Sequence, residues 1–360
     1  MNRALIAMSG GVDSAVAALL TRDAGYDCVG CTMKLCPAPP SDGPDSRSCC
    51  TADDAADARS VAFRLGMPHY VFNYTERFQR EVIGSFIAAY QNGRTPNPCV
   101  ECNRNLKFGA LLERAEELGC ACVVTGHYAR IAERDGMFYL MKGLDPARDQ
   151  SYVLYMLSQA QLARIRFPLG TLSKPEVRAI AAAQGFRNAG KPDSQDICFV
   201  PEGDYAAVIE RYTGKEASPG DFLDRNGHVL GRHRGVIRYT VGQHRGLGLG
   251  THERLCVLAI DPAANTVTLG PEEALYRTEL TAGDFHWISG AAPAQPLRCA
   301  VRTRYRQREQ EALALPLDGG RVKIVFDRPQ RAITPGQSAV LYAGDTVLGG
   351  GIIERGGEET

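Results

Sequence analysis

Residues Ala7 to Ser14 read Ala-Met-Ser-Gly-Gly-Val-Asp-Ser and follow a short apolar stretch at the start of the chain. That stretch, Ala4–Ala7, predicts a strand, and the apolar residues of Ala15–Leu20 predict a helix directly after the loop. Gly10 and Gly11 let the backbone turn sharply and approach a ligand closely. The first turn of the helix points unsatisfied N–H groups and the positive end of its dipole at the loop. We therefore predict an anion-binding strand–loop–helix unit.

This loop differs from the common nucleotide-binding motifs. It lacks the Gly-Lys-Ser/Thr ending of a Walker A loop and the G-x-G-x-x-G spacing of a dinucleotide fingerprint. Residues Ser9–Ser14 resemble the pyrophosphate loop of ATP pyrophosphatases, which cleave ATP between the α and β phosphates. The alternative is an ordinary N-capped turn. We expect Asp13 both to cap the helix and to help orient magnesium and phosphate.

The amino-terminal half of the chain alternates between strand patterns and helix patterns. Strands are predicted at Ala4–Ala7, Asp27–Met33, His69–Asn73 and Cys122–Gly126, and helices at Ser14–Ala24, Asp53–Leu65, Phe78–Gln91 and Leu106–Leu118. This alternation predicts an α/β fold with a doubly wound parallel sheet, which binds ligands at the carboxyl ends of its strands. The stretch Pro37 to Ser48 is predicted to be a long surface loop.

The pattern changes after Gly220 to short strands separated by Asn-Gly, Pro and Gly turns. We therefore predict three domains. Residues 1–205 form an ATP-pyrophosphatase-type, nucleotide-binding and catalytic domain. Residues 206–280 form a small β-rich central domain, and residues 281–360 form a C-terminal β-barrel. Before the change, Lys174-Pro175-Glu176 predicts the start of a helix.

The composition is that of an ordinary soluble protein, with 44% hydrophobic and 23% charged residues in a chain of 360. No apolar run approaches the roughly 20 residues that a membrane-spanning helix needs, and the first residues lack a signal-peptide pattern. We therefore expect a cytoplasmic monomer without membrane contact. In a reducing compartment, its 12 cysteines are expected to be buried thiols, metal ligands or catalytic groups.

Charge is balanced over the whole chain, with 41 basic and 41 acidic residues, but not along it. The stretch from Arg298 to Arg331 holds nine Arg and Lys residues against four Asp and Glu residues. The stretch from Arg232 to Arg254 holds five Arg residues against one Glu, and it includes His233. Such local surpluses are typical of surfaces that contact a phosphate backbone. We expect His233 on the surface or facing RNA.

Two thiols lie close together in the sequence, and a third lies far from them. Residues 93–103 read Gly-Arg-Thr-Pro-Asn-Pro-Cys-Val-Glu-Cys-Asn, and the prolines are expected to keep this segment out of a helix. Cys99 and Cys102 then lie at the junction with the next helix, whose positive end lowers the pKa of a thiol. The third thiol, Cys198, begins an apolar run.

Several short motifs occur in a fixed order along almost the whole chain. They are Ser9–Ser14, Thr95-Pro96-Asn97-Pro98 with Cys102-Asn103, Thr125-Gly126-His127-Tyr128, Asp149-Gln150-Ser151-Tyr152, Asp193-Ser194-Gln195 with Cys198-Phe199, Arg302-Thr303-Arg304-Tyr305-Arg306, Thr334 to Val340, and Leu348 to Ile353. Each motif alone is moderately specific. Together they resemble the bacterial tRNA-specific 2-thiouridylase family, so the resemblance implies an ATP-dependent tRNA-uridine 2-sulfurtransferase.

The resemblance implies 2-thiolation of the wobble uridine of tRNA. The C2 oxygen of uracil is a poor leaving group, and adenylation of that oxygen by ATP, with release of pyrophosphate, makes it a good one. Sulfur from a cysteine persulfide then attacks C2 and displaces AMP. The implied cofactors are ATP and Mg²⁺, and the implied partners are tRNA and a cysteine desulfurase or sulfur-relay protein.

The resemblance also assigns roles to individual residues. Cys102 is the nucleophile, and Cys198 carries the persulfide. ATP is expected to contact Ala7, Met8, Ser9, Gly10, Gly11, Val12, Asp13, Ser14, Met33 and Gly126. The target base, which must leave the anticodon stack, is expected to meet Asn97, Pro98 and Cys99. The rest of the tRNA is expected to contact the two β-rich domains and His127, Asp149, Gln150, Ser151, Arg304, Tyr305 and Gln337.

One position departs from the family pattern, which commonly has an aspartate where this chain has Cys99. A cysteine cannot copy the acid–base or polar role of an aspartate, but it forms a set of three thiols with Cys102 and Cys198. Related sulfur-transfer enzymes use three cysteines to hold a four-iron four-sulfur cluster, so a cluster is one interpretation. The other is thiol–persulfide exchange through a Cys102–Cys198 disulfide bond.

Other cysteines are assigned structural roles. Cys28 and Cys31 lie three residues apart on a predicted strand, so they face opposite sides of the sheet and are not expected to chelate zinc together. The thiols expected to be small core residues are Cys120, Cys122, Cys256 and Cys299.

Two other functions explain part of the sequence. A small-molecule ATP-pyrophosphatase ligase or amidotransferase would use the glycine loop, but it would leave Cys102, Cys198 and the basic domains without a role. A non-enzymatic metal- or RNA-binding module would not need Asp13. The first alternative requires that pyrophosphate release be independent of tRNA.

Overall fold

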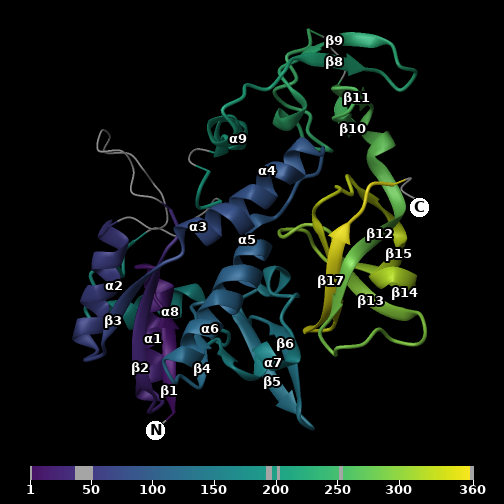
Figure 1. Cartoon of the computed structure of the whole chain (residues 1–360). Helices are drawn as coiled ribbons and strands as arrows, with labels where there is room; N and C mark the ends of the chain where they lie inside the picture. The colour runs from purple at the N-terminus through teal and green to yellow at the C-terminus, as the bar shows by residue number, and fades with distance from the viewer. Residues whose placement is uncertain (1, 37–51, 192–196, 201–202, 251–253, 357–360) are drawn as a thin grey trace.

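The computed structural model describes residues 2–36, 52–191, 197–200, 203–250 and 254–356. The predicted loop Pro37 to Ser48 and the motif Asp193-Ser194-Gln195 lie outside the described residues. Three sheets organise the described chain (Figure 1). The α/β part lies at the left of that view, the antiparallel barrel at the right, and a small sheet above both.

The first sheet has the strand order β3-β2-β1-β4-β7, and every neighbouring pair is parallel. Its strands are β1 (Arg3–Ala7), β2 (Asp27–Lys34), β3 (His69–Asn73), β4 (Cys122–Val124) and β7 (Ile165–Arg166). Two hydrophobic clusters cover its two faces. Cys31 belongs to the cluster that includes Leu5 and Phe78, whereas Cys28 belongs to the cluster that includes Ile6 and Val16. The predicted doubly wound parallel sheet is therefore confirmed, as is the opposite orientation of these two thiols.

Helices pack on both sides of this sheet, among them α1 and α2 on one face and α6 on the other. The helical segments up to residue 213 are α1 (Val12–Asp23), α2 (Ala52–Arg64), α3 (Thr75–Phe78), η1 (Gln79–Ile83), α4 (Gly84–Gln91), α5 (Pro98–Glu101), η2 (Cys102–Ala110), α6 (Leu111–Glu117), η3 (Ser151–Val153), α7 (Gln159–Ala163), α8 (Lys174–Ala183) and α9 (Tyr205–Thr213). The segments η1 and η2 are π-helical. Such segments are rare and occur often at functional sites.

The strand order reverses between β1 and β4. The chain leaves β1 to build β2 and β3 on one side, and β4 then adds to the other side of β1. Open α/β sheets bind ligands in the crevice at such a reversal, at the carboxyl ends of the strands. The glycine loop after β1 and the segment Thr125–Gly126 after β4 both lie at this point.

The helix that carries the paired thiols begins earlier than the sequence analysis predicts. Pro98 is its first residue, and the helical path continues through α5, η2 and α6 to Glu117. Proline is favoured at the first helical position, because its N–H is not needed there and its φ angle suits a helix. The prediction that the prolines keep this segment out of a helix is therefore wrong from Pro98 onward.

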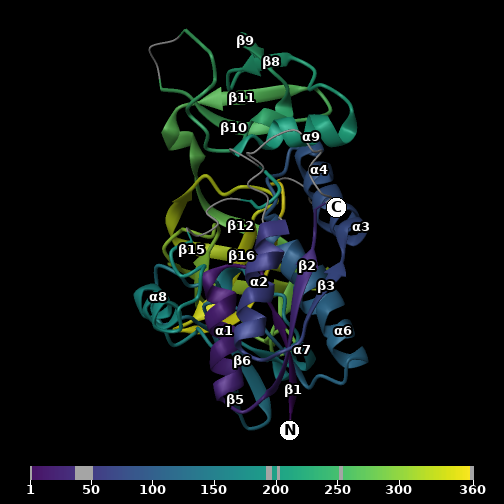
Figure 2. The same ribbon diagram turned by 90° about the vertical axis from the view of Figure 1, so that its left-hand side faces the viewer.

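The small sheet has the order β10-β11-β8-β9. Its strands are β8 (Gly220–Leu223), β9 (Val229–His233), β10 (Cys256–Asp261) and β11 (Thr266–Gly270). Figure 2 shows it at one end of the molecule, beyond α4 and α9. His233 is buried here against the rings of Phe222 and Tyr239, so the prediction of an exposed His233 is wrong.

The last sheet closes into a six-stranded antiparallel barrel. Its strands are β12 (Tyr276–Trp287), β13 (Leu297–Arg302), β14 (Gln310–Leu317), β15 (Arg321–Arg331), β16 (Ser338–Ala343) and β17 (Thr346–Ile353). The order is β12-β15-β14-β13-β16-β17, and β17 pairs back with β12. The predicted C-terminal β-barrel is confirmed. Cys299 lies in the barrel core, and Cys120, Cys122 and Cys256 are also buried, as predicted.

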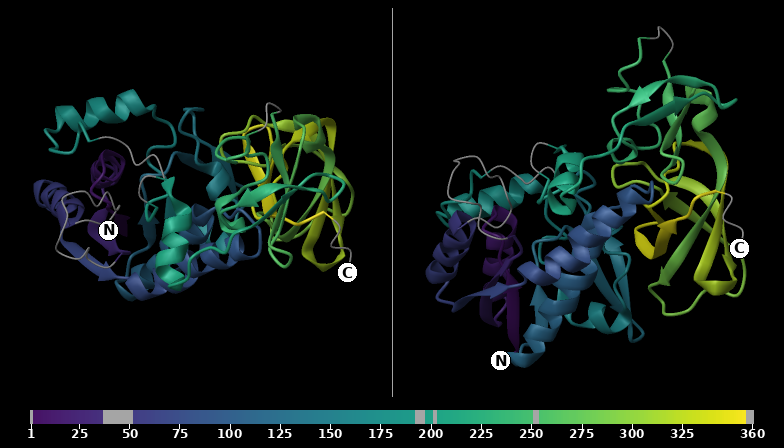
Figure 3. Two further views of the ribbon diagram at one scale, coloured as in Figure 1. Left: turned by 90° about the horizontal axis from the view of Figure 1, so that it is seen from above. Right: turned by 45° about the horizontal axis from the view of Figure 1, so that its top comes forward.

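The α/β part and the barrel lie beside each other when viewed from above (Figure 3, left). A hairpin of the first half, β5 (Ala129–Arg134) and β6 (Met137–Lys142), extends the barrel sheet, because Met141 pairs with Thr346 on β17. Within the described parts of the chain, no helix is long and apolar enough to cross a membrane.

Candidate active site

The glycine loop is held in shape by hydrogen bonds of its own and by its neighbours. Gly10 has a φ of +78°, and a Cβ there would overlap the backbone of Asp54 on α2. The backbone N–H of Ser9 donates to Ser14 Oγ (3.2 Å), which in turn donates to the carbonyl of Gly11 (3.0 Å). α1 starts from Gly11 without a side-chain cap. Its first N–H groups and positive dipole end therefore suit an anion.

One further residue predicted to contact ATP, Gly126, lies beside this loop. A Cβ on Gly126 would come within 2.9 Å of the backbone carbon of Asp13 and 3.0 Å of the Ser14 nitrogen. Only glycine allows the segment after β4 to pack this closely on the first turn of α1. Met33, near the carboxyl end of β2, is buried in the same hydrophobic cluster as Cys102. The structure thus brings the loop and Gly126 together.

Asp13 does not cap α1, which corrects one prediction. Both of its carboxylate oxygens accept hydrogen bonds from Lys174 Nζ, at 2.7 and 2.8 Å. The hydroxyl of Tyr128 donates to Asp13 Oδ1 at 2.8 Å. Lys174 is not among the predicted site residues, because Lys174-Pro175-Glu176 indicates only the start of a helix in the sequence. Nothing local indicates the contact, because the lysine lies 161 residues from the aspartate.

Other polar side chains support the loop from the same side. Asn188 Nδ2 donates to the carbonyl of Gly10 (3.0 Å). Lys191 Nζ donates to Asp54 Oδ1 (2.6 Å) and to Asp57 Oδ2 (2.9 Å) on α2. Because the Asp54 backbone lies directly against Gly10, Lys191 holds α2 next to the loop. These residues also come from parts of the chain that the motifs do not cover.

The paired thiols lie on the first turns of the α5–η2 helix. Asn97 is the N-cap, and its Oδ1 accepts a hydrogen bond from the Cys99 backbone N–H at 3.1 Å. Cys99 is exposed, whereas Cys102 is only 8% exposed and marks the start of η2. Cys198 is partly exposed, and all three are present as thiols. The side chain of Asn97 therefore orders the turn that presents Cys99.

Although the Cys99 side chain reaches solvent, the protein around it raises the pKa of its thiol rather than lowering it. Desolvation by that surrounding protein is the largest cause, and the charge of Lys107 opposes it. The negative charge of a Cys198 thiolate would raise the pKa of Cys99 further, so the two thiols lie within electrostatic range of each other. Lys107 is a further cation near the thiols that the sequence analysis missed.

The barrel contributes an aromatic ring to this region. Tyr305 is 36% exposed, and its ring packs edge-on against Tyr152 at a centroid distance of 5.9 Å. Burial is the main cause that raises the pKa of Tyr305, and the nearby charges of Asp149 and Cys99 add to it. A half-exposed tyrosine close to Cys99 suits stacking with a base that has left its helix.

Three other residues predicted to contact tRNA form hydrogen bonds inside the protein instead. Asp149 is buried and accepts hydrogen bonds from Ser151 Oγ (3.0 Å) and Arg302 Nη1 (2.9 Å), while Gln150 Oε1 accepts one from the Tyr128 backbone (2.9 Å). Ser151 is fully buried. In this conformation, the three side chains join the α/β part to the barrel and to the segment after β4.

His127, Arg304 and Gln337 also make internal contacts. His127 is 7% exposed, and its Nδ1 lies 2.7 Å from Thr125 Oγ1; burial lowers its pKa well below the usual value. Arg304 Nη2 donates to Thr334 Oγ1 (2.6 Å) and to two backbone carbonyls, and Gln337 Nε2 donates to the carbonyl of Thr95 (2.8 Å). These contacts support structural roles for all three side chains.

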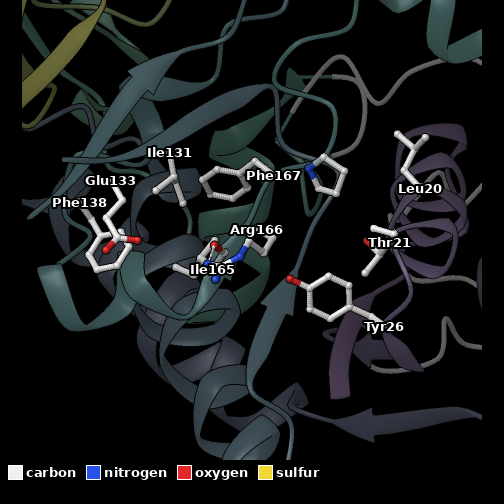
Figure 4. A pocket seen from close by; sticks show the side chains of 11 residues that line it. Leu20, Thr21, Tyr26, Ile131, Glu133, Phe138, Ile165, Arg166 and Phe167 are labelled. Atoms are coloured by element: carbon white, nitrogen blue, oxygen red, sulfur yellow. Dashed lines mark hydrogen bonds between the residues drawn. The ribbon is translucent and has the colours of Figure 1, made fainter. Parts of the chain in front are cut away.

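A separate cavity lies away from the glycine loop (Figure 4). It has a volume of about 450 Å³ and borders the carboxyl end of α1, where Leu20, Thr21 and Tyr26 face Arg166 and Phe167. None of the predicted site residues lines it. Across the described residues, no group of three or more His, Cys, Asp or Glu side chains is arranged to hold a metal ion.

Three family models match the chain in succession. A model described as the tRNA methyl transferase HUP domain matches residues 2–202, and one described as the tRNA methyl transferase PRC-barrel domain matches residues 206–271. A model described as the aminomethyltransferase beta-barrel domain matches residues 277–353. Together the matches run through the α/β part, the small sheet and the barrel.

Curated relatives match over nearly their whole length. A protein of Acidithiobacillus ferrooxidans is 47% identical over 353 residues, which cover 98% of each chain, and one of Chloroflexus aurantiacus is 49% identical over 356 residues, or 99% of each chain. Both are named tRNA-specific 2-thiouridylase MnmA. A solved 4-thiouridine synthetase–RNA complex with bound ATP aligns with 58% of this chain and 50% of its own, at 20% identity and a TM-score of 0.38.

Proposed function

The chain belongs to the tRNA-specific 2-thiouridylase family, and on this premise we propose that it performs ATP-dependent 2-thiolation of the wobble uridine of tRNA. The enzyme is a tRNA sulfurtransferase that uses ATP. The observation that carries the proposal is the combination, in one chain, of an uncapped glycine loop after β1 with the thiols of the α5–η2 helix. The loop serves the activation of uracil, and the thiols serve the delivery of sulfur.

The first half-reaction transfers AMP to the base. The C2 oxygen of uracil attacks the α phosphate of ATP, and pyrophosphate leaves. Backbone N–H groups of the residues from Gly10 to Ser14 and the dipole of α1 stabilise the negative charge on the phosphates, because they are fixed before ATP binds. Met33 and Gly126 border the adenosine side of this site. Mg²⁺ would be held by the phosphates together with the Asp13 carboxylate, and it would offset part of the phosphate charge.

The second half-reaction delivers sulfur. The terminal sulfur of a persulfide on Cys198 attacks C2, and AMP leaves with the electron pair of the C–O bond. The Cys102 thiolate then attacks Cys198 Sγ, the bond between that atom and the transferred sulfur breaks, and its electron pair forms the thiocarbonyl. A Cys102–Cys198 disulfide remains, which an external thiol reductant returns to two thiols.

The geometry favours this persulfide route over a four-iron four-sulfur cluster. Cys99, Cys102 and Cys198 are all described, and they do not form a group that could hold a metal ion. Iron and sulfide analysis of anaerobically purified enzyme and of Cys99→Ala tests this: stoichiometric iron in active enzyme that is lost in the variant would favour the cluster.

We assign tRNA binding to the two β-rich domains, residues 206–280 and 281–360, together with the segment Asn97–Cys99. Tyr305 stacks on the target base, and the exposed Arg306 contacts a phosphate. The persulfide on Cys198 comes from a cysteine desulfurase or a sulfur-relay protein, and the partial exposure of this thiol supports direct transfer from such a partner.

The central experiment separates the two half-reactions. Cys102→Ser and Cys198→Ser are expected to abolish thiolation of tRNA, while both variants still bind ATP and tRNA and release pyrophosphate in a tRNA-dependent reaction. Cys256→Ser, at a thiol of β10 that is buried in a cluster with Leu275 and Ala332, is the control and is expected to retain thiolation. Thiolated tRNA from either active-site variant would contradict the assigned roles. Pyrophosphate release without tRNA would instead indicate a small-molecule ligase.

A further inference from the structure

A single carboxylate joins three segments of the chain at the entrance to the glycine loop. Asp13 is the second residue of α1, and it is contacted by Lys174 at the start of α8 and by Tyr128 after β4. The lysine makes a two-pronged contact, with its Nζ at 2.7 Å from Oδ1 and 2.8 Å from Oδ2. Its side chain is 7% exposed, whereas that of Asp13 is 32% exposed. The carboxylate therefore faces solvent on one side and a buried ammonium on the other.

Lys174 is held in this place by the architecture of its own helix. Ser173 is the N-cap of α8, and both its N–H and its hydroxyl donate to Glu176 Oε2 at 2.7 Å. The backbone N–H of Lys174 donates to Asp145 Oδ2 at 3.2 Å. The capping box and the proline that follows fix the direction of the first turn. The lysine thus points at Asp13 from a rigid base.

Without a cation beside it, the negative charge of Asp13 would oppose the binding of phosphate in this loop. ATP carries several negative charges, and repulsion between like charges grows where protein replaces water. An ammonium group that contacts both carboxylate oxygens cancels this charge and fixes the orientation of the side chain. The hydroxyl of Tyr128 holds Oδ1 in the same orientation.

We propose that Lys174 is a positioning residue for ATP binding, which acts by neutralising and orienting Asp13 so that the loop accepts a nucleoside triphosphate. It acts through Asp13 rather than through the phosphates themselves. The inference rests on the proposed function for the identity of the nucleotide. It does not depend on tRNA or on the thiols.

A double-mutant cycle on the full-length protein tests this role. ATP affinity is measured by calorimetry in the presence of EDTA, so that a metal ion on Asp13 does not contribute. Lys174→Met is expected to weaken ATP binding by about tenfold, because the Asp13 carboxylate then keeps its full negative charge and loses its fixed orientation. Asp13→Asn with Lys174→Met is expected to recover most of this loss, because the uncompensated charge is gone.

Conservative and remote variants complete the test. Lys174→Arg keeps the charge and is expected to remain within about threefold of the wild-type affinity, so the proposal stays testable if Lys174→Met does not fold. Lys323→Met, in an exposed barrel pair with Glu279, is the matched control and is expected to bind ATP normally. The Lys174 variants should bind tRNA with unchanged affinity.

Two outcomes would overturn the proposal. If the double variant binds ATP as weakly as Lys174→Met, the lysine contacts the phosphates directly and does not act through Asp13. If Lys174→Met binds ATP as tightly as the wild type, the ion pair has no part in nucleotide binding. Failure of the proposed function would look different, because wild-type protein would then bind ATP without thiolating tRNA.

Discussion

The side-chain amide of Gln337 in the barrel donates a hydrogen bond of 2.8 Å to the backbone carbonyl of Thr95, in the loop that precedes Cys99. The same loop is held by two other contacts, since the Thr95 N–H donates to the carbonyl of Pro335 (2.8 Å) and Thr95 Oγ1 donates to Thr240 Oγ1 (3.4 Å). The barrel and the central domain therefore both fix the segment that leads to the proposed base-binding turn.

Gln337→Glu removes the donor while keeping the size of the side chain. We expect the single-turnover rate constant for tRNA thiolation to fall, because the loop before Asn97 and Cys99 is no longer fixed, whereas tRNA affinity stays the same. Single-turnover kinetics together with filter binding measure the two quantities. A parallel loss of tRNA affinity would show instead that Gln337 contacts tRNA directly, as the sequence analysis predicts.

Arg304 and Arg306 are two residues apart but are expected to behave differently. Arg304 is held by Val241, Ala332 and Thr334, and burial lowers its pKa, whereas Arg306 is exposed. Arg306→Ala is expected to reduce the slope of log affinity for tRNA against log salt by about 1, the effect of losing one phosphate contact. Arg304→Ala is expected mainly to lower the melting temperature. The reverse pattern would place the phosphate contact at Arg304.

The ion pair between Arg302 and Asp149 joins the barrel to the α/β part, and the Asp149 side chain is only 2% exposed. Arg302→Met leaves this carboxylate buried without its cation and is expected to cost about 3–5 kcal/mol of the free energy of unfolding. Arg298→Met, which breaks an exposed barrel pair with Asp327, is the control and is expected to change little. Urea unfolding compares them, and equal effects would contradict a buried interdomain pair.

The buried His127 is expected to make the free energy of unfolding depend on pH. Burial lowers its pKa well below the usual value in the folded state, so between the two pKa values only the unfolded chain takes up the proton. The stability due to His127 is therefore present above about pH 6.5 and is lost as the pH falls, by up to ~1.4 kcal/mol per pH unit. Melting temperatures at pH 7.5 and 5.5 should differ more for the wild type than for His127→Asn. An equal decrease in both would assign the effect to other groups.

Much of the α/β part was predictable because its signals are local. The helix predicted at Asp53–Leu65 is found at Ala52–Arg64, and the strand His69–Asn73 matches its prediction residue for residue. Apolar periodicity decides such elements, because a residue's face depends only on its position along the helix or strand. The start at Pro98 is also encoded locally, by Asn97 as N-cap and proline at the first helical position, although proline inside a helix would break it.

The site residues were predictable only as a set of candidates. The motifs placed Tyr305 and Cys99 in one functional group, and the structure brings them close together. The motifs could not distinguish a residue that contacts tRNA from one that joins two parts of the protein. Asp149, Ser151 and His127 are buried because segments far apart in the sequence pack against one another. Burial depends on which faces meet, and that in turn depends on the whole fold.

By itself, the sequence determined the strands and helices of the α/β part and the glycine loop that follows β1, because each depends on neighbours within a few residues. The tertiary structure alone decided that Lys174 neutralises Asp13 and that Gln337 holds Thr95, across 161 and 242 residues of chain. The physical reason is that a buried charge or a backbone carbonyl takes whichever partner the packing of distant segments brings within hydrogen-bonding distance.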